Sequence, residues 1–151
     1  MPERVLTALE CAALGLWAGA LAGFAFVVAP LAIRIVTPLD SFAALVSAVI
    51  RALGTFGATC GGIAVASAGA RALLSSAARP LAFVRIALII IGIGASAYET
   101  SAIVPQMEAT ARRIPGAIDS VPKSDPRRAA YDAEHAQSSK VYSIAFLCVL
   151  I

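Results

Sequence analysis

The sequence predicts an all-α integral membrane protein: a four-helix transmembrane bundle with one charged loop between the third and fourth helices. Of the 151 residues, 60% are hydrophobic and only 14% are charged, and the mean hydropathy is +0.86. Soluble domains carry about 45–50% apolar and about 25% charged residues, so this chain lacks the polar side chains for a water-facing surface. Its long apolar runs show no strand-like alternation. Helices are therefore favoured, because backbone groups in lipid must be paired internally.

The first predicted helix covers residues 8–34. It contains the uncharged run 11–33, whose 23 residues exceed the roughly 20 that a helix needs to cross a hydrocarbon core about 30 Å thick. A cleaved signal peptide is the alternative, because Arg4 precedes the apolar run. The length of the run and its scattered small residues favour a membrane span instead.

The second predicted helix, residues 42–73, contains the uncharged run 52–70. Apolar residues continue upstream of that run, and Asp40 or Ser41 provides a good N-cap. Arg51 is then embedded in the helix.

The third predicted helix covers residues 80–104. It begins at Pro80, because proline is favoured at the first helical position, and it is expected to end or kink at Pro105. Residues 105–128 change to charged residues and prolines and are predicted to form the polar loop. The first part of this loop is able to continue as a short polar helix.

The fourth predicted helix covers residues 129–151 of what we expect to be a single membrane domain, residues 1–151. Its uncharged part, residues 141–151, has 11 residues, which are too few to span a bilayer. Either the polar first turns are buried in protein, or the natural chain continues beyond residue 151. We favour a truncated C-terminus, because an apolar end without a charged anchor is unusual for a membrane helix.

Glycines recur at four-residue spacing on the first two predicted helices. Small residues at this spacing let membrane helices approach closely. We therefore expect these helices to pack together inside the bundle, with a homodimer face as the alternative. The glycines are Gly15, Gly19, Gly23, Gly57 and Gly61.

Alternating helix directions place one set of polar residues at the loop side of the membrane. Ionisable residues within spans usually face the bundle interior or a cavity, so we expect a polar cluster in which Glu99 lies near Arg34, Arg51 or His135. The alternative is that the arginines extend to the lipid headgroups and that Glu99 is hydrated. The predicted polar face comprises Arg34, Arg51, Glu99, His135 and Ser138, and the opposite side receives Glu10, Arg71, Arg79 and Arg85.

The sequence offers no complete catalytic or metal-binding motif. His135 is the only histidine, so a metal or heme would need ligands from a second residue type or a second subunit. Ser138 and Ser139 follow it on a helix, without residues that would form an oxyanion hole. The cysteines lie apart in apolar runs and share no metal-ligand spacing. We therefore expect no catalytic residues, no cofactor, no metal and no enzyme activity.

Three stretches carry a resemblance to a known family: LGLWAGALAGFAFVVAPLAIR (14–34), IVPQMEATARR (103–113) and DPRRAAYDAEHAQSS (125–139). The chain resembles the transmembrane-protein-205-like membrane domain of unknown function. The shared features are Ala29, Pro30 and Arg34 after the glycine-rich helix, Pro105 before Met107, and His135 three residues before Ser138. Ala133 and Glu134 depart from the aromatic and leucine often found there. The resemblance implies a four-helix membrane fold and no reaction. A weaker likeness to copper-resistance D-type membrane domains leaves metal handling open.

Three functions from different classes remain open. The first is a non-enzymatic role, as an accessory or scaffold subunit or as a lipid-binding bundle. The second is a small-molecule or metal (copper-type) carrier that uses Arg34, Glu99 and His135. The third is a heme- or quinone-linked membrane enzyme.

The expected partners are membrane lipids, with other membrane-protein subunits or a second copy of the chain as further possibilities, and no nucleic acid. The expected location is the bacterial inner membrane, with several passes. Eight lysines and arginines lie at the loop side against four at the other side, which favours a cytoplasmic loop.

Overall fold

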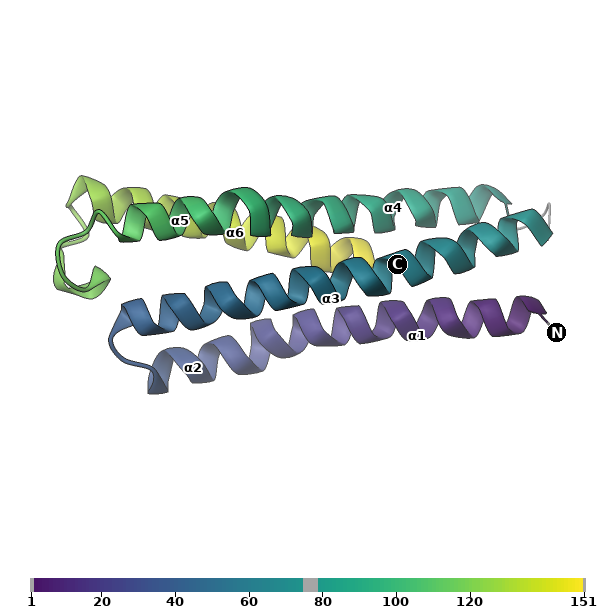
Figure 1. The fold of residues 1–151 in the computed structure, drawn as a ribbon, viewed down its shortest axis with the longest axis horizontal. Coiled ribbons are helices and arrows are strands. Elements are labelled where there is room, and N and C mark those ends of the chain that lie inside the picture. The colour runs from purple at the N-terminus through teal and green to yellow at the C-terminus, as the bar shows by residue number, and fades with distance from the viewer. Residues whose placement is uncertain (1, 75–78, 151) are drawn as a thin grey trace.

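A computed structural model describes residues 2–74 and 79–150, which form four helical rods along the long axis of the molecule, each antiparallel to the rod before it in the chain (Figure 1). These residues contain helices and turns but no β-strand. The all-α bundle predicted from the apolar runs is therefore confirmed.

The first rod consists of α1 (Pro2–Gly23), a π-helical turn η1 (Phe24–Val28) and α2 (Ala29–Ile35). The second rod is α3 (Leu39–Leu74). The third rod consists of α4 (Arg79–Tyr98), a π-helical turn η2 (Glu99–Ile103) and α5 (Val104–Ala111). A loop with a short 3-10 turn η3 (Ile118–Ser120) leads to the fourth rod, α6 (Pro126–Val149).

Three of the rods are long and apolar enough to cross a membrane: Pro2–Ile35, Leu39–Leu74 and Arg79–Ala111, with 34, 36 and 33 residues. At 1.5 Å per residue each is about 50 Å long, which exceeds the hydrocarbon core of about 30 Å. Large apolar side chains cover their outer surfaces; Ile35, for example, is 77% exposed. Such surfaces suit lipid rather than water.

Several predicted boundaries differ from the structure. The first helix begins at Pro2 rather than at residue 8, and the third continues through Pro105 to Ala111. The polar loop is therefore shorter than the predicted range 105–128. The fourth helix begins at Pro126, and its predicted end at residue 151 lies outside the described residues.

The two π-helical turns explain why Pro30 and Pro105 do not end their helices. Proline lacks an N–H group, and its ring clashes with the carbonyl four residues earlier in a regular α-helix. Each proline follows a turn with wider, five-residue hydrogen bonds: Ala29 N–H bonds the Phe24 carbonyl, and Val104 N–H bonds the Glu99 carbonyl. The wider turns let both rods continue past the prolines.

The first two rods pack closely around Trp17, which is 0% exposed. A Cβ atom built on Gly57 would lie 2.6 Å from Trp17 Cε2, and one on Gly61 would lie 2.7 Å from Ile93 Cδ1. Only glycine therefore fits at these two positions of α3 without a shift of neighbouring atoms. The expected close pairing of the first two helices is confirmed.

The expectation that the glycines of the first helix pack inside the bundle is wrong. Gly15, Gly19 and Gly23 have no atom within 4 Å of a built Cβ, so this glycine face makes no close helix contact. Trp17 and Leu21 lie on the opposite, buried side of α1. Packing the Trp17 indole against the glycines of α3 takes more apolar surface out of contact with solvent or lipid than a contact between two glycine faces would. This explains why α1 turns its Trp17 side, and not its glycine side, towards the bundle interior.

Candidate functional site

A cavity of about 840 Å³ lies towards the loop end of the bundle. Its lining comes from the end of the first rod, the first half of α3, α5, the loop and the first half of α6. Ligand pockets in proteins are typically about 300–1,000 Å³, so the volume suits a small molecule. This cavity is the candidate functional site.

Two facing walls of the cavity differ in polarity. The α6 wall is polar throughout: Arg128, Tyr131, Asp132, His135, Ser138, Ser139, Tyr142 and Ser143. The wall formed by the first rod and α3 is mostly apolar: Phe24, Ala25, Ala29, Ile33, Leu39, Phe42, Ala43, Ala44, Val46 and Ile50, with Asp40 and Ser47 as its polar members. The cavity is thus amphipathic across its width.

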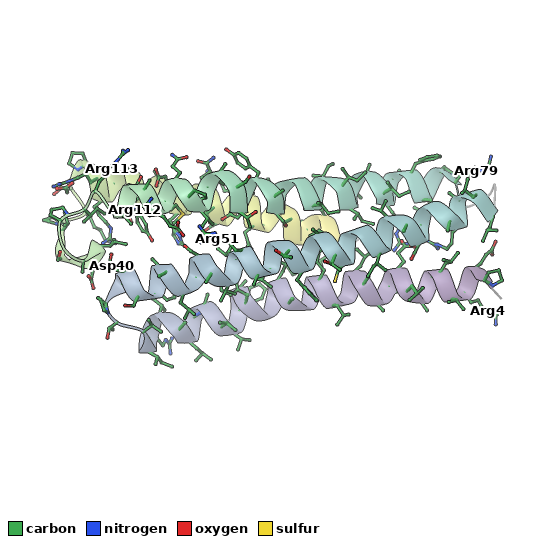
Figure 2. All side chains as sticks on the ribbon, viewed as in Figure 1. Arg4, Asp40, Arg51, Arg79, Arg112 and Arg113 are labelled. Atoms are coloured by element: carbon green, nitrogen blue, oxygen red, sulfur yellow. The ribbon has the colours of Figure 1, made fainter. Side chains whose placement is uncertain are left out.

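The charged groups at the outer end of the cavity hold the loop in place. Arg128 pairs with Asp132 at 3.0 Å and donates to the Ile118 carbonyl at 2.6 Å. Asp40 accepts a hydrogen bond from the Ile118 N–H at 3.2 Å. Asp40 and Arg112 lie at the loop end of the bundle in Figure 2, as does Arg113. Ile118 is completely buried beneath these contacts.

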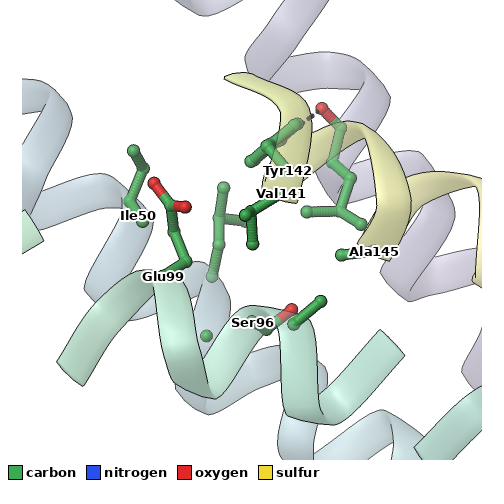
Figure 3. A pocket seen from close by; sticks show the side chains of 10 residues that line it. Ile50, Ser96, Glu99, Val141, Tyr142 and Ala145 are labelled. Carbon is green, nitrogen blue, oxygen red and sulfur yellow. Dashed lines mark hydrogen bonds between the residues drawn. The ribbon is translucent and has the colours of Figure 1, made fainter. Parts of the chain in front are cut away.

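Glu99 lies at the inner end of the cavity, one side chain behind its wall. It is 2% exposed, and one carboxylate oxygen accepts a hydrogen bond from the Ser138 hydroxyl. Its other oxygen, Oε2, is buried and has no hydrogen-bond partner among the described residues. Glu99 also lines a second space of about 10 Å³. In Figure 3 its carboxylate points towards Ile50.

The Glu99 space and the larger cavity share two wall residues, Ile50 and Tyr142. Tyr142 also pairs with Phe24, with ring centroids 5.9 Å apart, and donates a hydrogen bond to the Leu21 carbonyl at 2.7 Å. This inner end therefore combines two aromatic rings, the Ser138 hydroxyl and a buried carboxylate.

Shortly before each π-helical turn, a backbone carbonyl accepts a hydrogen bond from a side-chain hydroxyl. Leu21, three residues before η1, accepts from Tyr142, and Ser96, three residues before η2, accepts from Thr100 at 3.0 Å. These bonds satisfy backbone acceptors beside the irregular turns. The turn η2 in turn carries Glu99 at its first position.

The predicted polar face is assembled only in part. Glu99 and Ser138, both members of the predicted face, are in contact, although this particular contact was not predicted. Arg51 instead pairs with Glu108 of α5 at 2.8 Å, while Arg34 and His135 are exposed. His135 still lines the large cavity.

The predicted ion pair of Glu99 is therefore wrong. Within residues 2–74 and 79–150, no cation lies within ion-pair distance of Glu99. Arg51 has a carboxylate partner nearer the loop, and Arg34 lies in the last turn of α2, where its side chain extends outward.

A second buried carboxylate, which the sequence interpretation did not pair, lies at the opposite end of the bundle. Glu10 of α1 is 0% exposed and forms ion pairs with Arg71 of α3 and with Arg85 of α4, the latter at 3.1 Å. Arg71 also donates to Thr7 Oγ1 at 3.3 Å. From the sequence, the alternating helix directions already place all three charged residues at the same membrane side. That shared position was the feature from which their ion pairs could have been predicted.

Two acidic residues, Glu134 and Asp125, anchor the first half of α6, the helix that forms the polar wall. Glu134 accepts hydrogen bonds from Gln106 at 3.0 Å and from Thr110 at 2.9 Å, and these bonds tie α6 to α5. Asp125 caps the helix by accepting from the Arg127 N–H at 2.8 Å. Hydrogen bonds from the Arg127 side chain and backbone lower the pKa of Asp125 from 3.8 to about 2.

Neither end of the cavity presents a recognisable metal site. Among the described residues, no group of three or more His, Cys, Asp or Glu side chains is arranged to hold a metal ion. Cys60 and Cys148 are free thiols within the bundle, and Cys11 is exposed.

The helical rods with lipid-suited surfaces are those of a helical membrane protein, and an amphipathic cavity lies between them. Residues 12–114 match the family described as Domain of unknown function (DUF4149), and the chain belongs to that family. This match shows no link to the transmembrane-protein-205-like domains that the sequence resembles. Neither the curated proteins nor the solved structures include a match to this chain. The matched residues include Glu99 but end before α6.

Proposed function

We propose that this protein is a non-enzymatic membrane protein that binds a lipid-like amphiphile in the amphipathic cavity. The observation that carries the proposal is the difference between its two walls: hydroxyl, imidazole and charged side chains on α6 face an apolar wall on α2 and α3. An amphiphile would place its polar groups along the first wall and its hydrocarbon chain along the second.

The state of the α6 hydroxyls supports this assignment. Ser139 donates to the His135 carbonyl at 3.0 Å, and Ser143 donates to the Ser139 carbonyl at 2.8 Å. Their protons are therefore used within the helix, while their oxygens can still accept hydrogen bonds from a ligand. Such a wall tolerates an apolar environment without a ligand and offers acceptors when one is present.

The remaining expectations about cellular context belong to this proposal. We place the protein in the bacterial inner membrane as a multi-pass protein, with membrane lipids as its first partners. An accessory role beside other membrane subunits is compatible with amphiphile binding. The resemblance to transmembrane-protein-205-like domains implies the same helical membrane fold.

Native mass spectrometry of the detergent-purified protein tests amphiphile binding. Ala43→Trp would place an indole in the cavity, because Ala43 lines it, whereas Ala48→Trp on the same helix would add the indole at an exposed position outside the lining. We expect the parent and Ala48→Trp to retain an added amphiphile after mild activation, and Ala43→Trp to lose it. Equal retention by all three proteins, or no retention by the parent, would contradict the proposal.

A further inference from the structure

Glu99 is a buried carboxylate with no cationic partner in the described part of the chain, and it lies within a rod suited to span a membrane. Taking a carboxylate out of water without an opposite charge is costly, and intramembrane ionisable residues usually serve a site. The Ser138 hydroxyl satisfies one of its oxygens, and Oε2 stays unpartnered. The buried negative charge of Glu99 is therefore not balanced by a positive charge among the described residues.

We propose that the amphiphile bound in the cavity carries an ammonium group, which sits at the inner end of the cavity and faces Glu99. This inference rests on the proposed function and names the substrate class of the same site. The ammonium would approach past Ser138, whose hydroxyl lines the cavity and bonds the Glu99 carboxylate.

The aromatic pair beside Glu99 favours the same ligand chemistry. Phe24 and Tyr142 both line the cavity, and their rings are inclined at 54° to each other. Aromatic faces attract ammonium groups through the ring quadrupole, and sites for alkylammonium ligands commonly combine such faces with a carboxylate. In the low dielectric of a membrane bundle, a carboxylate attracts a cation strongly even without direct contact.

The charged side chains that line the cavity, apart from Arg112, already have partners. Arg128 pairs with Asp132, Glu108 pairs with Arg51, and Asp40 accepts a backbone hydrogen bond. Arg112 is exposed at the loop end. Glu99 is thus the ionisable group of the inner end whose charge is left for a ligand.

The test uses three amphiphiles with the same alkyl chain: dodecylamine, dodecanol and dodecanoate. Their binding to the full chain is measured by isothermal titration calorimetry in nonionic detergent near neutral pH, where the amine is protonated. The variants are Glu99→Gln, which keeps the shape and removes the charge, and Glu3→Gln as a matched control, because Glu3 is exposed at the start of α1 and lies outside the cavity lining. Ratios between parent and variant cancel the partitioning of each probe into micelles. Circular dichroism confirms that each variant is folded.

We expect Glu99→Gln to weaken dodecylamine binding by about tenfold, because the attraction between the carboxylate and the ammonium is lost, and to leave dodecanol binding unchanged. Glu3→Gln should bind dodecylamine as the parent does. Equal weakening of the amine and the alcohol, or an unchanged amine affinity in Glu99→Gln, would overturn the ammonium inference while amphiphile binding stands. Failure of all three probes to bind the parent would overturn the proposed function itself.

Discussion

Two buried glutamates occupy the bundle with different surroundings. The charge of Glu10 is compensated by the guanidinium groups of Arg71 and Arg85, whereas the Glu99 carboxylate has the Ser138 hydroxyl as its one partner among residues 2–74 and 79–150. The first arrangement links three rods and suits a structural role. The second leaves a charge unmatched and suits a binding role.

Replacement of Glu10 tests the structural assignment at the residue scale. Glu10→Ala would leave two largely buried guanidinium groups without their shared carboxylate, which typically costs about 3–5 kcal/mol of unfolding free energy. Thermal unfolding in detergent should therefore show a large loss of stability. Asp119→Ala in the exposed loop is the control, with an expected change within about 0.5 kcal/mol. Similar melting temperatures for both variants would show that the Glu10 cluster stabilises nothing.

The cap of α6 predicts a pH dependence. Because the pKa of Asp125 is lowered from 3.8 to about 2 in the folded protein, its charged form stabilises the fold above pH 3.8, and this contribution is lost as the pH falls towards about 2. Asp125→Asn keeps a capping oxygen and removes the charge. The parent should melt above the variant near neutral pH, and the difference should shrink across this window. A difference that is constant with pH would show that the Asp125 charge does not contribute.

At the scale of elements, the contact between α1 and α3 depends on glycines only where Trp17 lies against them. Gly57→Ala forces a Cβ against the indole and should cost about 1–3 kcal/mol through overpacking. Gly19→Ala meets no neighbouring atom and should be neutral or slightly stabilising, because alanine favours helices. Thermal unfolding of the two variants checks this. A larger loss of stability in Gly19→Ala than in Gly57→Ala would contradict the orientation of α1 in which Trp17 faces the bundle interior and Gly19 does not.

The apolar runs predict the helical rods because lipid solvation imposes length and continuity on a span. They do not reveal which face of α1 turns inward, since the glycine spacing and Trp17 lie on different faces and only the packed bundle decides between them. The sequence also could not predict that the third helix continues through Pro105. The π-helical turn that accommodates this proline depends on how the third rod packs against its neighbours.

The candidate site, too, was predictable from the sequence only in part. Glu99 and Ser138 could be assigned to the same membrane side from the sequence, but their hydrogen bond could not be predicted. The partner of Arg51 was not predictable either, because Glu108 is part of a helix only once α5 extends past Pro105. The difference between the cavity walls also needed the structure. It depends on the polar side of α6 facing α3 across a space rather than packing against it.

At the scale of the whole molecule, the bundle should lie in a membrane with its charged loop in water. Single cysteines at Ile63 and Ser120, in a chain without the native cysteines, report this directly: both positions are exposed on the protein, but Ile63 lies within a predicted span. In permeabilised membranes, a membrane-impermeant maleimide should label Ser120→Cys quickly and Ile63→Cys slowly. Both should label equally after denaturation in detergent. Equal labelling in membranes would contradict the span assignment.

We expect the space between α3 and α6 to hold an amphiphile. A crystal structure grown from a lipidic phase with dodecylamine tests this most directly, because it would show the ligand itself. We expect continuous alkyl density along Val46 and Ile50, with its polar end beside Ser138 and facing Glu99. A bundle in which α6 packs directly against α3, with no space between the walls, would rule out amphiphile binding at this place.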